Sequence, residues 1–221
     1  MSHFSAVGGA RAILKAATDL FANTGYDSAS LAEIANRAGV CKANIFHHFA
    51  SKESLYLEVV KAASRADEEY AKTLLGESCP VTEKLRRLAR FRLQYMLDHR
   101  SESLLACREM SDDGRSSVRH LARDVLQRNF RLLMALFEQG RSSGEFREDI
   151  DPAVTSLTLV AAQDFYFRFH GTLGEFDETR HCADPVRYAD AIVDLMLDGI
   201  SAPRAACTVR SKRRRRASVP L

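Results

Sequence analysis

The stretch LAEIANRAGVCKANIFHHFASKESL, residues 31–55, decides the fold of the N-terminal part of the chain. Ser30, just before this stretch, and Glu33 within it form an S-x-x-E pattern. In this pattern a hydroxyl and a carboxylate each accept a free amide of the helix start. The pattern predicts a helix that ends at Gly39, where the chain needs a left-handed or crowded backbone. Its apolar face recurs every three or four residues and consists of Leu31, Ile34, Ala35 and Ala38.

A second short helix is predicted over residues 42–49, directly after this glycine turn. Ile45 and Phe49 return to the core, and two short helices joined by a tight turn predict a helix-turn-helix. At about 100° per residue, the face opposite Ile45 is small, polar and aromatic and consists of Ala43, Asn44, Phe46 and His47. Such a face suits the major groove of DNA, where asparagine can bridge an adenine edge.

The start of the third helix offers a phosphate site. Ser51 caps this helix and Lys52 opens it, so free amides, the positive end of the helix dipole and an ammonium group could converge on one phosphate. The plainer interpretation is an ordinary cap followed by a solvated lysine. Each residue alone favours that interpretation, whereas the two together, in this order, favour phosphate contact.

These residues together resemble the TetR (tetracycline-repressor-like) family of transcription regulators. The resemblance covers residues 10–55 and rests on Gly25, Tyr26, Ser30, Ile34, Ala35, Ala38, Gly39, Val40, Lys42, Ile45, His47, His48, Phe49, Ser51, Lys52, Glu53 and Leu55. It implies an all-α, dimeric, ligand-responsive regulator, most often a repressor that occupies the promoter. It also implies DNA contacts from Lys42, Ala43, Asn44, Phe46, His47, His48 and Lys52.

Two residues depart from the family pattern. Phe46 stands where the family usually has tyrosine, so a hydroxyl contact to phosphate is lost. Cys41 stands where serine is common, which weakens or alters the start of the second helix. Cys41 also raises an alternative, a thiol-sensing regulator on the same scaffold, because an oxidised cysteine would add bulk and polarity beside DNA. A buried or inert thiol is the plainer interpretation.

Composition argues for a folded, non-membrane protein. Of the 221 residues, 46% are hydrophobic and 28% are charged, which is enough apolar content for a well-buried core. The chain has no run of about 18 apolar residues and no secretory pattern, so the expected location is the cytoplasm, away from membranes. The five cysteines include no C-x-x-C pair. We therefore expect reduced thiols, no metal and no cofactor.

Enzyme chemistry is not indicated. His47 and His48 with nearby Glu53 could suggest a metal or acid–base site, but adjacent residues on a helix project in different directions. A ligand spacing such as H-E-x-x-H is also missing from the sequence.

Charge is distributed unevenly along the chain. Residues 1–60 hold five basic and five acidic groups, so the predicted DNA-binding part is neutral overall. Residues 201–221 hold seven basic groups and no acid, and without them 25 basic groups face 29 acidic ones, a balance of −4. The net charge of +3 thus comes from this tail, which we expect to be disordered by self-repulsion. It is either a solvated extension or a second contact to DNA phosphates.

The pattern divides the chain into four parts. We predict a flexible arm at residues 1–9, a helix-turn-helix domain at 10–55, a ligand-binding and dimerisation domain at 56–200, and the basic tail at 201–221. Further helices are predicted over residues 10–24, 51–75, 82–97, 103–110 and 116–139, with a loop at 140–144.

The last two helices are predicted to form the dimer interface. Asp151-Pro152 and Asp184-Pro185 each place a capping side chain before a proline at the first helical position. Residues 153–169 and 186–200 are apolar almost all round, which requires burial on both sides. Their twofold copies would supply that burial, and the family resemblance implies the same. The two helix-turn-helix domains of such a dimer would then bind half-sites of a roughly palindromic operator.

An effector cavity is expected among the middle helices. The aromatic and soft side chains that could line it are Phe91, Tyr95, His99, Phe130, Met134, Phe137, Phe165 and Phe169. For each of them, ordinary core packing is the commoner role. We expect a small apolar or aromatic molecule to bind there and to weaken DNA binding.

Overall fold

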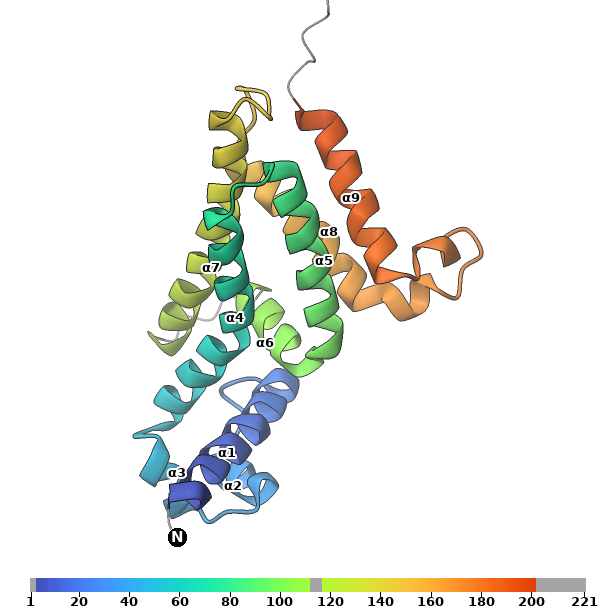
Figure 1. The fold of residues 1–221 in the computed structure, drawn as a ribbon. Helices are drawn as coiled ribbons and strands as arrows, with labels where there is room; N and C mark the ends of the chain where they lie inside the picture. Colours follow the sequence, from blue (N-terminus) through green and yellow to red (C-terminus); the bar gives the residue numbers. More distant parts are fainter. Residues whose placement is uncertain (1–2, 112–116, 202–221) are drawn as a thin grey trace, which may run out of the picture.

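The computed structural model describes residues 3–111 and 117–201, and within these ranges the chain is all-α (Figure 1). A single antiparallel bridge, between Phe146 and Ser201, is the only extended pairing in this part of the chain. The elements are α1 (His3–Thr24), α2 (Leu31–Ala38), α3 (Lys42–His48), α4 (Lys52–Gly76), α5 (Val81–Asp98), α6 (Arg100–Ser111), α7 (Ser117–Ser142), α8 (Pro152–Leu173), a 3₁₀ turn (Arg180–Cys182) and α9 (Pro185–Ile200).

Helices α1, α2 and α3 form a small head at one end of the molecule (Figure 1). Their apolar faces meet the start of α4 in one core, whose most deeply buried members are Ile13, Leu20, Phe21, Ile34, Ile45 and Leu55. Helix α4 runs from this core into the larger helical body without a break. The head and the body therefore share one rigid helix across the predicted boundary at residue 55.

The predicted start and end of α2 are found, with one difference. The Ser30 hydroxyl accepts the Glu33 amide at 3.0 Å, and Gly39 adopts the left-handed conformation at φ 67°. The Glu33 carboxylate does not complete the reciprocal pattern that the sequence predicts. It accepts the Arg37 guanidinium one turn later, at 2.6 Å, because residues four apart share a helix face.

Three helix boundaries differ from the sequence prediction by three residues or more, and one of them is the start of α6, which lies at Arg100 and not at residue 103. Helix α1 begins at His3, inside the predicted arm, because extending a formed helix costs far less than nucleating one, even through glycine. Helix α7 continues through Gly140 to Ser142, where a loop was predicted. The ring of Phe146 packs against Gly140 so closely that a Cβ there would lie 2.1 Å from it. Gly140 is therefore a packing contact and not a helix end.

The body surrounds a second core, formed by α4, α5, α7, α8 and α9, that includes Leu74, Leu93, Leu136, Phe137, Tyr166 and Val193. Asp151 and Asp184 cap α8 and α9 as predicted, each accepting two amides of the first turn. Helix α9 is less uniformly apolar than predicted. Its Asp190 carboxylate accepts the Arg90 guanidinium of α5 at 2.5 and 2.9 Å, and its Asp194 carboxylate pairs with Arg86.

The predicted basic tail falls almost entirely on residues 202–221, outside the described part of the chain. Residues 112–114, whose Asp-Asp-Gly sequence predicts a turn, also lie outside it. No helix among the described residues has the length and apolar character needed to cross a bilayer.

Candidate functional site

Helix α3 presents the predicted DNA-contacting face to solvent. Ile45 is fully buried and holds the helix on the head, while Lys42, Ala43 and His47 are exposed and Phe46 is 49% exposed. Asn44 and His48 are half-buried. The seven residues predicted to contact DNA are thus brought together on α3 and at the start of α4.

Helix α1 accounts for the partial burial of Asn44 and His48. Gly9 lies beside them, since a Cβ on Gly9 would be 3.5 Å from His48 Nε2 and 4.0 Å from Asn44 Oδ1. The start of α1, which the sequence predicts as part of a flexible arm, therefore supports one side of α3.

The start of α3 is weakly capped. Cys41 occupies the N-cap position with extended backbone, and its side chain makes no capping hydrogen bond. Its thiol is exposed at the point where α3 begins. A serine hydroxyl at this position would accept an amide of the first turn, so the departure from the family pattern leaves α3 held mainly by packing.

The start of α4 is well ordered by side chains. Ser51 and Ser54 cap each other's amides, with O to N distances of 3.1 and 3.0 Å. The Lys52 ammonium lies 4.5 Å from the centre of the Tyr26 ring and donates to the Asp27 carbonyl at 3.4 Å. A lysine has three donors, so this anchoring leaves others for a phosphate.

Hydrogen bonds beside Lys52 keep a carboxylate ionised. Glu53 accepts from its own backbone amide, from Ser51 and from Tyr26, which together lower the pKa of its carboxyl group. Burial, followed by the hydrogen bond to Glu53, raises the pKa of the Tyr26 phenol. The turn after α1 is thus tied to the first turn of α4.

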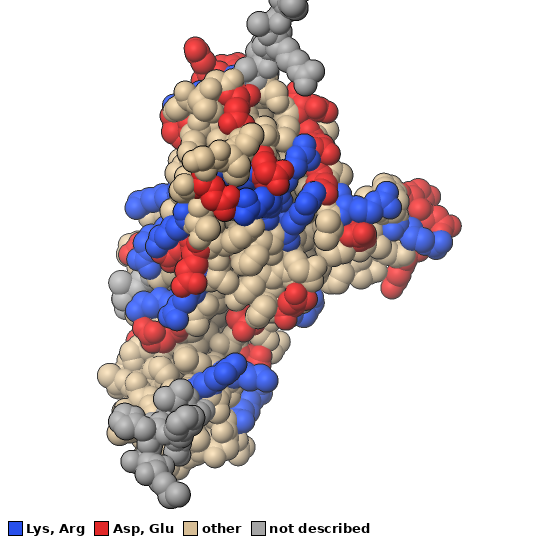
Figure 2. Space-filling view, in the orientation of Figure 1, with Lys and Arg blue, Asp and Glu red and all other residues tan. Residues whose placement is uncertain are grey.

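The head has little positive charge of its own. Figure 2 shows basic and acidic side chains mixed over the body, and fewer charges over the head at the lower end of this face. On α2, Glu33 and Arg37 neutralise each other. Attraction to DNA phosphates would therefore depend on features other than the net charge of the head, such as free amides and helix dipoles.

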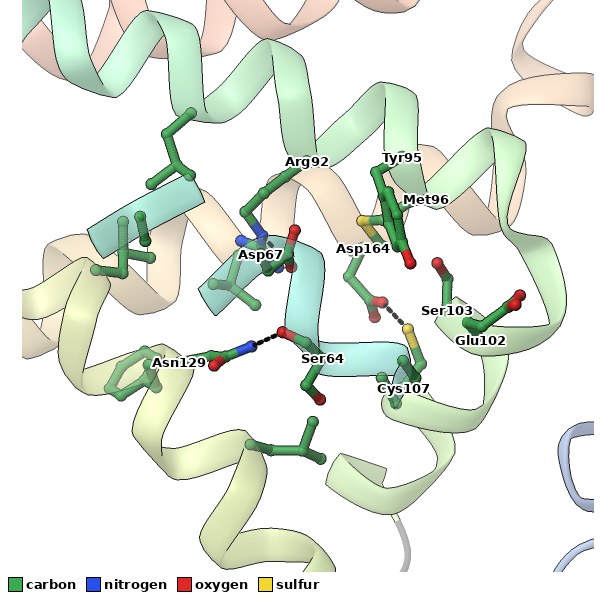
Figure 3. A pocket seen from close by; sticks show the side chains of 18 of the residues that line it. Ser64, Asp67, Arg92, Tyr95, Met96, Glu102, Ser103, Cys107, Asn129 and Asp164 are labelled. Atoms are coloured by element: carbon green, nitrogen blue, oxygen red, sulfur yellow. Dashed lines mark hydrogen bonds and ion pairs between the residues drawn. The ribbon is translucent and has the colours of Figure 1, made fainter. Parts of the chain in front are cut away.

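A cavity of about 270 Å³ lies within the body, between α4, α5, α6, α7 and α8 (Figure 3). Its polar and aromatic lining includes Ser64, Asp67, Arg92, Tyr95, Glu102, Cys107, Asn129, Phe130 and Asp164. Most of the remaining lining is alanine, leucine, valine and methionine. The cavity is mainly apolar, with a few convergent polar groups, which is typical of a small-molecule site.

Two of the eight residues predicted to bind an effector, Tyr95 and Phe130, line this cavity. The other six lie elsewhere. Phe137 packs in the body core against Phe146, Phe91 packs on Tyr70, and His99 stacks outside the lining on Tyr95, with ring centres 4.0 Å apart. Met134 is half-buried, and Phe165 and Phe169 are exposed on α8.

Most of the polar lining was not predicted from the sequence, from which only Asp164 and His99 stood out as possible polar groups of the site, with a solvated carboxylate or a satisfied buried histidine as the commoner role. Arg92 follows Leu88 by four residues and precedes Tyr95 by three, so it falls on the inward face of α5. Ser64 and Asp67 share one face of α4 in the same way. Polar residues at apolar helical positions were the available signal, and a search limited to aromatic side chains passes over them.

Arg92 organises one side of the cavity. Its Nε donates to Asp67 Oδ2 at 3.2 Å, and its Nη1 donates to Gln163 Oε1 at 3.1 Å. The Asn129 amide donates to the Ser64 carbonyl at 3.0 Å. Three buried atoms on this side, Ser64 Oγ, Asp67 Oδ1 and Asn129 Oδ1, have no hydrogen-bond partner among the described residues. Leaving such an atom unpaired costs about 1–3 kcal/mol.

A thiol and a carboxylate form the opposite side. Cys107 Sγ donates to Asp164 Oδ1 at 2.5 Å, and Asp164 Oδ2 accepts Arg168 at 3.0 Å. Burial, and next the hydrogen bond to Asp164, raise the pKa of the Cys107 thiol to about 12. Cys107 is therefore a neutral thiol at ordinary pH and a poor nucleophile.

Helix α6 links the cavity to the head. Glu102, Ser103 and Cys107 line the cavity, while Leu105, between them in sequence, is buried in the core of the head. On the side facing α1, the Ser101 hydroxyl donates to the Asp19 carboxylate at 2.6 Å.

A second contact between α6 and the head comes from one arginine. The Arg108 guanidinium donates to the carbonyls of Ala22 and Asn23 at 3.3 and 3.4 Å. It also lies against Gly25, where a Cβ would be 2.9 Å from it. A shift of α6 at the cavity would therefore change its contacts with the end of α1.

Comparison with known proteins supports this arrangement. Residues 13–59 match the model of the bacterial regulatory proteins, tetR family, and residues 80–195 match the tetracyclin repressor-like C-terminal domain. The HTH-type transcriptional regulator RutR of Escherichia coli K12 is 33% identical over 100 residues, which are 45% of this chain and 47% of RutR. The chain thus aligns with about half the length of that relative.

Two further comparisons extend over most of the chain. The fatty acid metabolism regulator protein of Bacillus subtilis is 21% identical over 188 residues, 85% of this chain and 93% of that protein. The structure of the transcriptional regulator FadR from Bacillus subtilis, in complex with stearoyl-CoA, superposes with a TM-score of 0.70. It is 19% identical, and the alignment covers 86% of this chain and 98% of FadR. These named relatives are regulators and not enzymes.

The match to the C-terminal domain alone spans more than half of the chain, and the match to the N-terminal domain covers the helix-turn-helix that the geometry places on the surface. The chain therefore belongs to the TetR family of DNA-binding transcriptional regulators.

Proposed function

We propose that the protein is a dimeric repressor in the cytoplasm, where bacterial DNA lies. It binds a palindromic operator through α3 of two copies and leaves the DNA when a small molecule enters the cavity. The observation that supports this most directly is α6, which lines the cavity on one side and holds the end of α1 on the other. Occupancy of the cavity and placement of the head thus depend on the same helix.

Dimerisation is proposed through the outer faces of α8 and α9. Among the exposed residues of α8, an apolar set recurs at three- and four-residue spacing and forms a stripe of Val154, Leu157, Ala161, Phe165 and Phe169, of which Leu157 and Ala161 also border the cavity. On α9, Leu195 is 70% exposed. Such a stripe is characteristic of a helix that packs against another surface. A twofold copy of the same face would cover it.

Selection of binding fragments from random duplex DNA tests the proposal. The full-length protein is expected to enrich one palindrome whose half-sites lie about one helical turn or a multiple of it apart. A reporter placed behind the enriched sequence should then be expressed less when the protein is present. Recovery of DNA without any common sequence would refute operator recognition, and increased reporter expression would indicate an activator.

Coupling through α6 gives a separate prediction. Arg108→Ala removes both hydrogen bonds from α6 to the end of α1, so a bound ligand should displace the head less effectively. We expect operator affinity without ligand to change less than about threefold, and the ligand concentration for half-release to rise at least about fivefold. Fluorescence anisotropy of labelled operator measures both quantities.

The matched control for this prediction is Arg131→Ala, which removes an exposed arginine of α7. It should leave the release curve unchanged. The test uses a compound whose occupancy of the cavity has been established by calorimetry. An Arg108→Ala protein that releases operator at the wild-type ligand concentration would contradict a role for α6 in coupling.

Cys41 supports a second candidate, a thiol-responsive regulator, because its thiol is exposed at the start of α3. In that case peroxide would oxidise Cys41 to the sulfenic acid, and the wild type would lose operator binding reversibly. Cys41→Ser should resist peroxide, whereas Cys79→Ser should respond like the wild type. Retained peroxide sensitivity in Cys41→Ser would eliminate this candidate.

The same substitution has an expected effect on stability. A serine at position 41 supplies the hydroxyl that the N-cap lacks, so Cys41→Ser should stabilise the protein by about 0.5–1 kcal/mol. Thermal unfolding should show a rise of a few degrees or less in the transition temperature.

A further inference from the structure

The polar groups of the cavity define the kind of molecule that fits it. Figure 3 shows Ser64, Asp67 and Asn129 together on one side, with Tyr95, Ser103 and Glu102 on the other. Ser64 is only 4% exposed, yet its hydroxyl has no partner within the described structure. A buried hydroxyl without a partner, on a residue that lines a cavity, is a group available to a ligand.

The two other unpaired atoms on this side are hydrogen-bond acceptors. Asn129 must direct its NH₂ at the Ser64 carbonyl, because a carbonyl only accepts, and this orientation leaves Asn129 Oδ1 facing away. Asp67 uses Oδ2 for Arg92 and leaves Oδ1 unpaired. Asn129 contacts the main chain of Ser64, and Asp67 follows Ser64 by one turn of α4, so the three residues lie on one side of the cavity (Figure 3). A ligand that donates hydrogen bonds would satisfy them.

The net charge of the cavity lining also favours a ligand that donates hydrogen bonds. The described lining carries three carboxylates, on Asp67, Glu102 and Asp164, against one cation, Arg92. Arg92 is already engaged by Asp67 and Gln163. Arg168 compensates Asp164 from outside the lining, which still leaves the region negative. Burial, and then the fields of Glu102 and Asp67, raise the pKa of the Tyr95 phenol, as expected beside negative charge.

The dimensions limit the ligand further. A volume of about 270 Å³ lies just below the usual range for sites that hold drug-sized molecules, about 300–1,000 Å³. The apolar part of the lining, including Leu88, Leu126, Phe130 and Leu133, suits a compact hydrocarbon or aromatic body.

We propose that the cavity binds a small amphipathic amine, with its apolar body between α5, α7 and α8 and its N–H groups donating to Asp67 Oδ1 and Asn129 Oδ1. Carboxylates and other anions are disfavoured there, because they would meet two unpaired acceptors and an excess of negative charge. The proposal rests on the proposed function in one respect, since it takes this cavity as the effector site.

Three probes with one hydrocarbon body test the ligand class on the full-length protein: phenylbutylamine, phenylbutanol and phenylbutyrate. Isothermal titration calorimetry without DNA is expected to show binding of the amine, weaker binding of the neutral alcohol, and binding of the carboxylate at least about tenfold weaker than that of the amine. A carboxylate that binds as tightly as the amine, or an amine that does not bind at all, overturns the proposal.

Variants locate the binding site. Asp67→Asn removes an acceptor and a charge, and Glu102→Gln removes a lining charge that is not paired with Arg92. The preference for amine over carboxylate should fall at least about tenfold in Asp67→Asn and about threefold in Glu102→Gln. The control Asp124→Asn removes an exposed carboxylate of α7 outside the lining and should keep the wild-type preference.

The folding of the variants and the release of operator are measured in experiments separate from ligand binding. Circular dichroism shows whether each variant is folded. If Asp67→Asn does not fold, the test of the site relies on Glu102→Gln. An unchanged preference in a folded cavity variant overturns the assignment of the site. Operator release, measured afterwards, distinguishes the two proposals. An amine that binds without releasing operator refutes the effector role alone, whereas a carboxylate that binds more tightly and releases operator refutes the amine alone.

Discussion

Replacing Asn44 and His47 together by alanine is expected to abolish sequence-specific DNA binding while the protein remains folded. His47 is exposed on α3 and Asn44 is half-buried beside it, whereas Ile45, which fixes this helix on the head, is untouched. A base contact contributes about 1–3 kcal/mol of discrimination, so the two changes should weaken each half-site by about 2–6 kcal/mol. At the lower limit this is a factor of about 30 per half-site.

The measurement compares affinity for the selected operator with affinity for an unrelated duplex at fixed salt. Non-specific binding depends mainly on lysine and arginine side chains, none of which the two substitutions remove, so the affinity for the unrelated duplex should stay nearly constant. The ratio of the affinity for the operator to the affinity for the unrelated duplex should therefore fall sharply.

A double variant on the body supplies the control. Gln127→Ala with His181→Ala removes an exposed amide and an exposed imidazole from α7 and the 3₁₀ turn, and it should keep the wild-type ratio. Specific binding that survives in the α3 variant, with the fold established by its thermal transition, would mean that base recognition resides in other residues.

The sequence predicted the capped starts of α2, α4, α8 and α9 well because a cap is a short-range feature. An N-cap such as Asp151 needs only its next three residues, and Asp184 repeats the same pattern. The buried face of α2 and α3 follows from a period of 3.6 residues. Such information lies within one or two turns of chain, so tertiary context seldom overrides it.

The end of α7 could not be predicted in this way. Gly140 reads as a helix stop by its own propensity, but the structure uses it to admit the ring of Phe146, six residues later, after a loop. Whether a glycine ends a helix or makes room for a side chain depends on what approaches it, and local sequence does not contain that information.

The cavity shows the same limit on a larger scale. Phe130 and Phe137 lie on one helix and are both aromatic, yet the first lines the cavity and the second packs in the core. The difference depends on which helices adjoin each turn of α7. The polar lining, by contrast, stood at otherwise apolar positions, so a search for inward-facing charges would have found Arg92 and Asp67.

Placing a charge on the outer face of α8 and α9 is expected to convert the protein to a monomer and thereby remove operator binding. Leu195, at 70% exposure, and Phe165, at 53%, are large apolar side chains that a single copy leaves in water. Ala191 and Gly199 lie four residues on either side of Leu195 and would let a second helix approach closely. A twofold interface contains each substitution twice, so one glutamate places two buried, unpaired charges in the dimer.

For Phe165→Glu and Leu195→Glu we expect monomers by light scattering at micromolar concentration, and operator affinity at least about 100-fold weaker, since each α3 then binds its half-site alone. Leu195→Ala adds no charge and should weaken the dimer without eliminating it. Thr73→Glu, on the exposed side of α4, carries the same charge elsewhere and should remain a dimer.

The two readouts separate dimerisation from DNA contact. Because neither substitution alters the head, a monomeric variant should retain weak binding to a single half-site, in contrast to the Asn44 and His47 variant, which should remain a dimer and lose recognition of both. If Phe165→Glu and Leu195→Glu both stayed dimeric at nanomolar concentration, the interface would have to lie on another face. The apolar stripe of α8 would then have to bind something other than a second copy of this chain.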